Sequence, residues 1–121
     1  KELAMMKDLQ FVLDKDYEKA RNEFKKVLEI SDHLQNRGFQ INPQLVQSVE
    51  AGIEFCELML LQVSEEKEKR SACFKVDAQI KFLNSGGSMV EYDSKKIRRE
   101  LHAVFSEALE QMAKKLRCDP I

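Results

Sequence analysis

Three cysteines and two histidines are the residues with the strongest potential for chemistry in this sequence. Cys56, Cys73 and Cys118 could supply thiol nucleophiles, and His33 and His102 could supply bases or metal ligands. A cysteine nucleophile needs a base within hydrogen-bond reach, and a zinc site needs ligands at chelating spacing. No two of these residues stand at such a spacing, and no glycine-rich phosphate loop occurs. We therefore predict a protein that is not an enzyme and binds neither metal nor cofactor.

The number and separation of the cysteines favour free thiols. Three widely separated cysteines do not fit a disulfide framework. Cys56 and Cys73 lie on apolar helix faces, where cysteine usually acts as a small buried hydrophobic residue. The first residues open directly into a helical pattern with no signal peptide. We therefore expect a reducing intracellular location, either cytoplasmic or nuclear.

The elements that carry these residues are predicted to be helices. The chain has 121 residues, of which 43% are hydrophobic and 34% charged, with four Gly and two Pro. This composition suits one folded domain and is too poor in Gly and Pro for a many-stranded sandwich or barrel. No apolar run is long enough to span a membrane. We predict a single all-α domain over residues 1–121, an antiparallel helical bundle of three to four long helices.

Apolar residues at steps of three and four predict where these helices lie. The first is expected over residues 2–36 as one long helix with a coiled-coil-like seam, although Asp16 could instead cap a new helix after a break. Asn42-Pro43 predicts the start of the second helix. A third helical stretch should end near Leu83, and the last helix should end near Cys118.

Two short polar segments fit more than one structure. Residues 64–71 fit either a solvated continuation of the second helix or a turn. Residues 86–89, Gly-Gly-Ser-Met, fit either a natural glycine-rich helix end or an artificial or loop-replacing joint. In the second case residues 1–85 would form a helical core and residues 90–121 a separate helix. Ser88 and Asp93-Ser94 are alternative caps for the last helix.

An excess of apolar residues near the end of the second helix is the feature most indicative of function. Such residues either fill the core or form a groove for an amphipathic partner helix or an oligomer interface. The four residues are Phe55, Leu58, Met59 and Leu61. We predict a non-catalytic interaction or dimerisation module, a scaffold or regulatory domain of a larger intracellular protein.

A basic face on the last helix supports an alternative function, binding of nucleic acid or another acidic ligand. Its residues are Lys95, Lys96, Arg99, His102, Lys114 and Arg117. Glu100, Glu107 and Glu110 share this side, and the net charge of the chain is −1. Both facts weaken the attraction to a polyanion, so nucleic acid is the less favoured partner.

Overall fold

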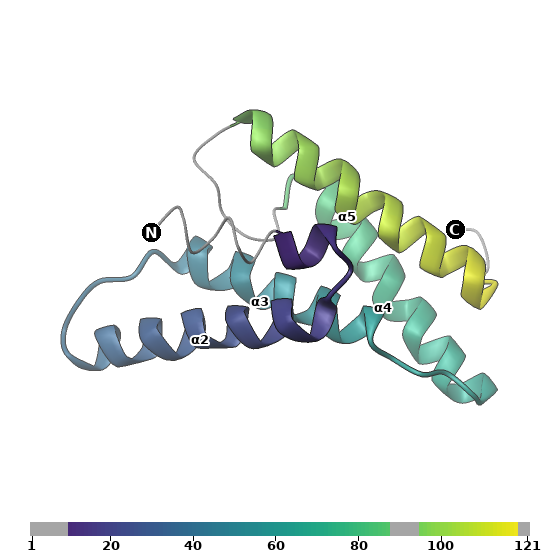
Figure 1. Ribbon diagram of the computed structural model, residues 1–121, viewed down its shortest axis with the longest axis horizontal. Coiled ribbons are helices and arrows are strands. Elements are labelled where there is room, and N and C mark those ends of the chain that lie inside the picture. Colours follow the sequence, from purple (N-terminus) through teal and green to yellow (C-terminus); the bar gives the residue numbers. More distant parts are fainter. Residues whose placement is uncertain (1–9, 88–94, 119–121) are drawn as a thin grey trace. The chain divides into compact units, whose positions relative to one another are not determined.

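All regular secondary structure in the described part of the chain is helical. The computed structural model describes residues 10–87 and 95–118, with no side-chain description for residues 95–98. These ranges contain no strand, and their long helices are α2 (Tyr17–Asn36), α3 (Pro43–Met59), α4 (Glu66–Asn84) and α5 (Lys95–Leu116) (Figure 1). The all-α prediction is confirmed for these residues, and the single bundle stays a prediction.

The long helices form two compact units, each an antiparallel pair. In the first unit α2 packs along α3, and in the second unit α4 packs along α5. The Tyr17 ring at the start of α2 contacts the Phe55 ring near the end of α3, with 5.8 Å between ring centroids. His102 near the start of α5 similarly lies beside Leu83 near the end of α4. Of the predicted joint at residues 86–89, only Gly86 and Gly87 are described, and they follow α4 in the second unit.

The prediction of one long helix over residues 2–36 is wrong within the described residues. Residues 10–13 are helical, and the helix ends where Lys15 adopts a left-handed φ of 61°. Asp16 then caps α2 by accepting a hydrogen bond from the Lys19 backbone N–H at 3.4 Å. Aspartate side chains compete with helix continuation by bonding to free backbone N–H groups. The alternative prediction, a new helix capped by Asp16, is therefore the one observed.

Local capping signals correctly predicted the end of α2, the start of α3 and the end of α4. α2 ends at Asn36, and Gly38 follows with a φ of 91°, a conformation in which glycine avoids the steric cost of a Cβ. Asn42 accepts a hydrogen bond from the Gln44 N–H at 2.9 Å, and Pro43 opens α3. After α4, Gly86 has a φ of 94°. Gly86 therefore lies in the left-handed position just after α4, while Ser88 and Met89 of the glycine-rich segment lie outside the described residues.

The polar segment 64–71 does not continue the second helix, because α3 ends at Met59, and its residues from Glu66 onward form the first part of α4. Residues 61–64 are not helical, and α4 begins at Glu66.

The last helix begins at Lys95 and ends at Leu116. Its predicted caps, Ser88 and Asp93-Ser94, lie outside the described residues.

The breaks between helices decide which apolar side chains are buried, and the pattern of burial therefore differs from the one expected for continuous helices. Val12 is 2% exposed, whereas the predicted seam residue Leu13 is 52% exposed, because the break after residue 13 interrupts the seam. Leu60 is 39% exposed because α3 ends before it. The buried hydrophobic residues of the long helices are Ala20, Phe24, Val49, Ile53, Phe55, Cys56, Leu58, Ala72, Val76, Leu83, Leu101, Phe105 and Leu109.

Replacing the residue that caps α2 tests the observed break. Asp16→Ala removes the side-chain acceptor at the N-terminus of α2, and we expect a loss of about 0.5–1 kcal/mol in the free energy of unfolding. Asp32→Ala, an exposed change within the same helix, is the matched control and should not destabilise the protein. Urea unfolding followed by circular dichroism measures both. Equal stability of the two variants would contradict the capping role.

Candidate functional site

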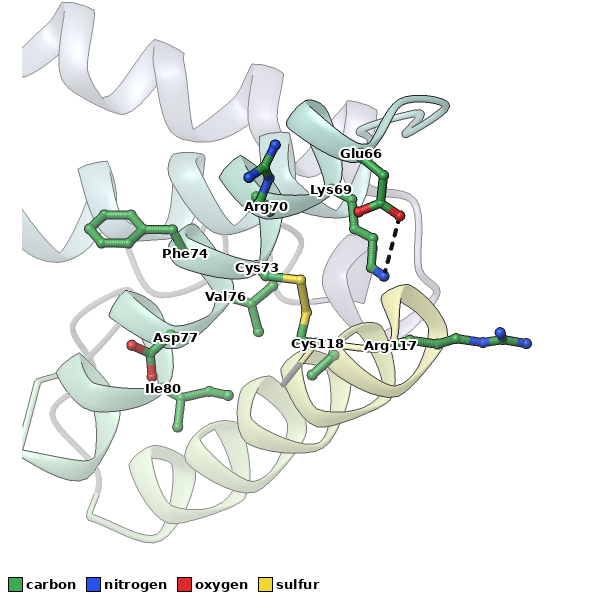
Figure 2. Close-up of a pocket in the computed structure, with 11 residues that line it drawn as sticks. Glu66, Lys69, Arg70, Cys73, Phe74, Val76, Asp77, Ile80, Arg117 and Cys118 are labelled. Atoms are coloured by element: carbon green, nitrogen blue, oxygen red, sulfur yellow. Dashed lines mark ion pairs between the residues drawn. A yellow bond between two sulfur atoms is a disulfide. The ribbon is translucent and has the colours of Figure 1, made fainter. Parts of the chain in front are cut away.

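A disulfide joins the two helices of the second unit. Cys73 on α4 bonds to Cys118 just after α5, with 5.6 Å between their Cα atoms (Figure 2). The expectation of three free thiols is therefore wrong. The antiparallel pairing of α4 and α5 brings together two cysteines that are 45 residues apart in the sequence, and sequence spacing alone does not contain that information. Cys56 is the remaining cysteine and is a free, buried thiol.

The end of α5 has a shape that directs Cys118 toward α4. Arg117 adopts a left-handed φ of 57°, and the Cys118 N–H donates to the Ala113 carbonyl at 2.9 Å. This is the usual way to end a helix, although glycine is more common in the left-handed position. With this turn at the end of α5, the Cys118 sulfur lies within bonding distance of Cys73.

A groove of about 600 Å³ borders the disulfide. It lies entirely in the second unit and is lined by residues of α4 and by residues at and just after the C-terminal end of α5 (Figure 2). Its apolar lining residues are Phe74, Val76, Ile80 and Ala113, together with the two cysteines. Its charged lining residues are Glu66, Lys69, Arg70, Asp77 and Arg117. A concave surface with apolar side chains and a few charged groups is typical of a binding site.

The most exposed large hydrophobic residue among those described lies in this groove. Phe74 is 75% exposed. The buried positions of α4 are Ala72, Val76, Gln79 and Leu83, and Phe74 is not one of them. At 100° per residue, Phe74 is about 160° from Val76 and so lies on the opposite side of the helix. An exposed aromatic ring in a groove offers apolar area to a partner.

The charges of the groove are unevenly paired. The Glu66 carboxylate lies 3.9 Å from the Lys69 ammonium, and the Asp77 carboxylate lies 3.1 Å from the Lys81 ammonium. The second carboxylate oxygen of Asp77 is buried without a hydrogen-bond partner among the described residues. Arg70 and Arg117 are exposed, and neither has an ion pair with a described residue. Two cationic groups are therefore available to a ligand.

The apolar residues predicted to bind a partner are divided between core and surface. Phe55 is fully buried and Leu58 is 2% exposed. Met59 is half-buried, and Leu61 is 44% exposed in the segment after α3. Partner binding by these four residues stays a prediction, and only Leu61 presents a large part of its side chain to solvent.

The predicted basic face of α5 is partly described. Arg99, Lys114 and Arg117 are exposed, as are the nearby Glu107 and Glu110. The side chains of Lys95 and Lys96 lie outside the described residues. Binding of an acidic ligand by this face stays a prediction.

His102 has a structural contact that the sequence did not indicate. His102 is exposed on α5, and its Nε2 lies 3.2 Å from the Leu83 carbonyl oxygen, to which the ring N–H donates. The last carbonyls of a helix lack partners within the helix. His102 therefore stabilises the end of α4 and joins it to α5.

Cys56 is held in a protonated, inaccessible state. Its side chain is fully buried in the first unit. Burial is the main cause that raises the pKa of this thiol to about 12; Arg21 lowers it by a smaller amount and Glu57 raises it further. The thiolate is the nucleophilic form of cysteine. The environment of Cys56 therefore suits a core residue and opposes nucleophilic chemistry.

The described residues contain neither a group of metal ligands nor a membrane-spanning helix. Within residues 10–87 and 95–118, no three His, Cys, Asp or Glu residues are grouped so that they could hold a metal ion. None of the helices in these ranges has both the length and the apolar character needed to cross a bilayer. No family model, curated protein or solved structure matches this chain. The groove beside the disulfide is therefore the candidate site.

Loss of the disulfide should destabilise the second unit. The bond closes a loop with a sequence separation of 45 residues, and cross-links of this length typically contribute about 2–4 kcal/mol by restricting the unfolded chain. We expect the double variant Cys73→Ser, Cys118→Ser to unfold at lower urea concentration by that amount. Wild-type protein treated with a dithiol reductant should show the same shift. Unchanged unfolding of both samples would contradict the cross-link.

Cys56 should make stability fall at alkaline pH. The folded-state pKa of about 12 lies above the ordinary thiol value of 9.0. The protonated thiol therefore contributes stability below pH 9, and this contribution is lost as the pH rises from 9 toward 12. Urea unfolding between pH 8 and pH 11 should show a smaller decrease for Cys56→Ala than for the wild type. An equal decrease would show that other groups cause it. In the native protein at pH 8, Cys56 should also resist alkylation.

Proposed function

We propose that this chain is a non-catalytic helical interaction module that binds a partner helix through exposed apolar surface. The observation that carries this proposal is the groove of the second unit, whose lining includes the 75% exposed Phe74 and the apolar residues Val76 and Ile80. Amphipathic helices commonly bind in hydrophobic grooves between helices. The aromatic ring would be the main apolar anchor, since aromatic residues dominate the energetics of many interfaces.

Dimerisation through the predicted seam of the first helix is a less favoured form of this proposal. Ala20, Phe24 and Ser31 of that seam are buried, and α2 packs along α3. These positions therefore serve the packing of the first unit. Self-association is retained as an outcome of the experiment below.

The single bundle and the intracellular location belong to the proposal as well. A disulfide persists where thiols are oxidised. With Cys73 and Cys118 joined, an intracellular module would require an oxidising compartment or state.

Binding of an amphipathic peptide tests the proposed function. We expect the protein to bind a labelled, uncharged helical peptide with one leucine-rich face, measured by fluorescence anisotropy. Phe74→Ser should weaken binding by about 1–2 kcal/mol, which is a five- to thirtyfold change in Kd. Phe39→Ser is the matched control, because Phe39 is 60% exposed but belongs to the first unit.

The oligomeric state completes this test. Sedimentation velocity over a hundredfold concentration range detects self-association. A strictly monomeric protein that binds no amphipathic peptide would contradict the proposed function. Equal weakening by Phe74→Ser and Phe39→Ser would reject the groove as the binding surface.

A further inference from the structure

The geometry points to an acidic amphipathic peptide segment as the occupant of the groove in the second unit, with its carboxylates at Arg70 and Arg117 and its apolar face on Phe74. This inference rests on the proposed function and adds the chemical class of the partner. It is carried by the charge pattern of the groove lining, in which Glu66 and Asp77 each have a lysine partner, whereas Arg70 and Arg117 have no ion pair among the described residues.

The ion pairs of the groove lining indicate whether the partner should be positively or negatively charged. Glu66 is balanced by Lys69 and Asp77 by Lys81, at distances of 3.9 Å and 3.1 Å. Arg70 and Arg117 have no ion pair with any described residue. A carboxylate on the partner would form charge-assisted hydrogen bonds with these guanidinium groups. A cationic partner would be repelled by both guanidinium groups.

The order of residues on α4 sets the arrangement of the partner. Arg70, Phe74 and Asp77 follow one another at steps of four and three, so they form a single stripe along the helix. Arg70 and Asp77 are seven residues apart, or about 10 Å along the helix axis. A segment lying along this stripe would meet a cation, an aromatic ring and an anion in that order. Its carboxylates should therefore be concentrated at one end.

The apolar lining favours a peptide over a nucleic acid. Val76, Ile80, Ala113 and the disulfide offer no hydrogen bonds to a phosphate backbone. Among the described residues, Phe74 is the only aromatic residue of the lining, whereas strands of nucleic acid usually stack on several such rings.

The test compares three labelled helical peptides of equal length in binding to the full chain. All carry the same leucine-rich face, and they differ at one end, which holds glutamates, glutamines or lysines. We expect the acidic peptide to bind at least tenfold more tightly than the basic peptide, with the uncharged peptide between them. The preference should decrease at high salt, because solvent-exposed charges are screened.

Two variants assign the binding energy to residues of the groove. The double variant Arg70→Glu, Arg117→Glu should weaken the acidic peptide at least tenfold while leaving the uncharged peptide within about threefold. Lys67→Glu with Lys75→Glu is the matched control, because both lysines are exposed on α4 outside the groove lining. Phe74→Ser should weaken all three peptides. Circular dichroism confirms that every variant keeps its helical content.

The outcomes separate this inference from the proposed function. If all three peptides bind equally, or if the lysine control has the same effect as the arginine variant, the acidic partner is rejected while the interaction module stands. If none of the peptides binds, the proposed function fails. Tighter binding of a single-stranded oligonucleotide that depends on Arg70 and Arg117 but not on Phe74 would identify a nucleic-acid site and overturn the inference.

Discussion

The packing of α4 against α5 is the interaction on which the candidate site depends. Leu101, Phe105 and Leu109 are buried at four-residue intervals, so one stripe of α5 is removed from water. The pair is also connected near both ends, by the His102 contact to the Leu83 carbonyl and by the disulfide. Apolar burial stabilises the pair without fixing its register. The two directional links supply the register, and the groove exists because that register is fixed.

This packing also explains why Phe74 is exposed. A helix can turn only part of its circumference toward a single neighbour. The buried positions of α4, from Ala72 to Leu83, recur at steps of three and four, and Phe74 lies outside that series. Arg70 and Asp77 share its side of the helix. The surface that the fold leaves available therefore combines an aromatic ring with charged groups, which is the composition needed for selective recognition of a peptide.

The sequence predicted those features that depend on neighbouring residues. Asn42-Pro43 and Gly38 mark their helix ends because capping is a local interaction. The disulfide and the His102 contact were missed because each joins residues brought together only by the pairing of α4 with α5. The sequence favours one long helix over residues 2–36 because no Gly or Pro interrupts it before Gly38, whereas in the structure Lys15 adopts a left-handed conformation that is uncommon for residues other than glycine. Because of that break, Val12 is buried and Leu13 is exposed, whereas an uninterrupted seam would have buried Leu13.

The groove also shows why overall charge was a poor guide to the partner. The chain has 20 basic and 21 acidic residues, which indicates no preference for an anionic ligand. Pairing, however, is decided at the scale of single ion pairs, since exposed charges farther apart than about 10 Å are largely screened. Glu66 and Asp77 each lie near a lysine of α4, whereas Arg70 and Arg117 have no ion pair among the described residues. A nearly neutral protein can therefore present arginines in a groove whose carboxylates already have lysine partners.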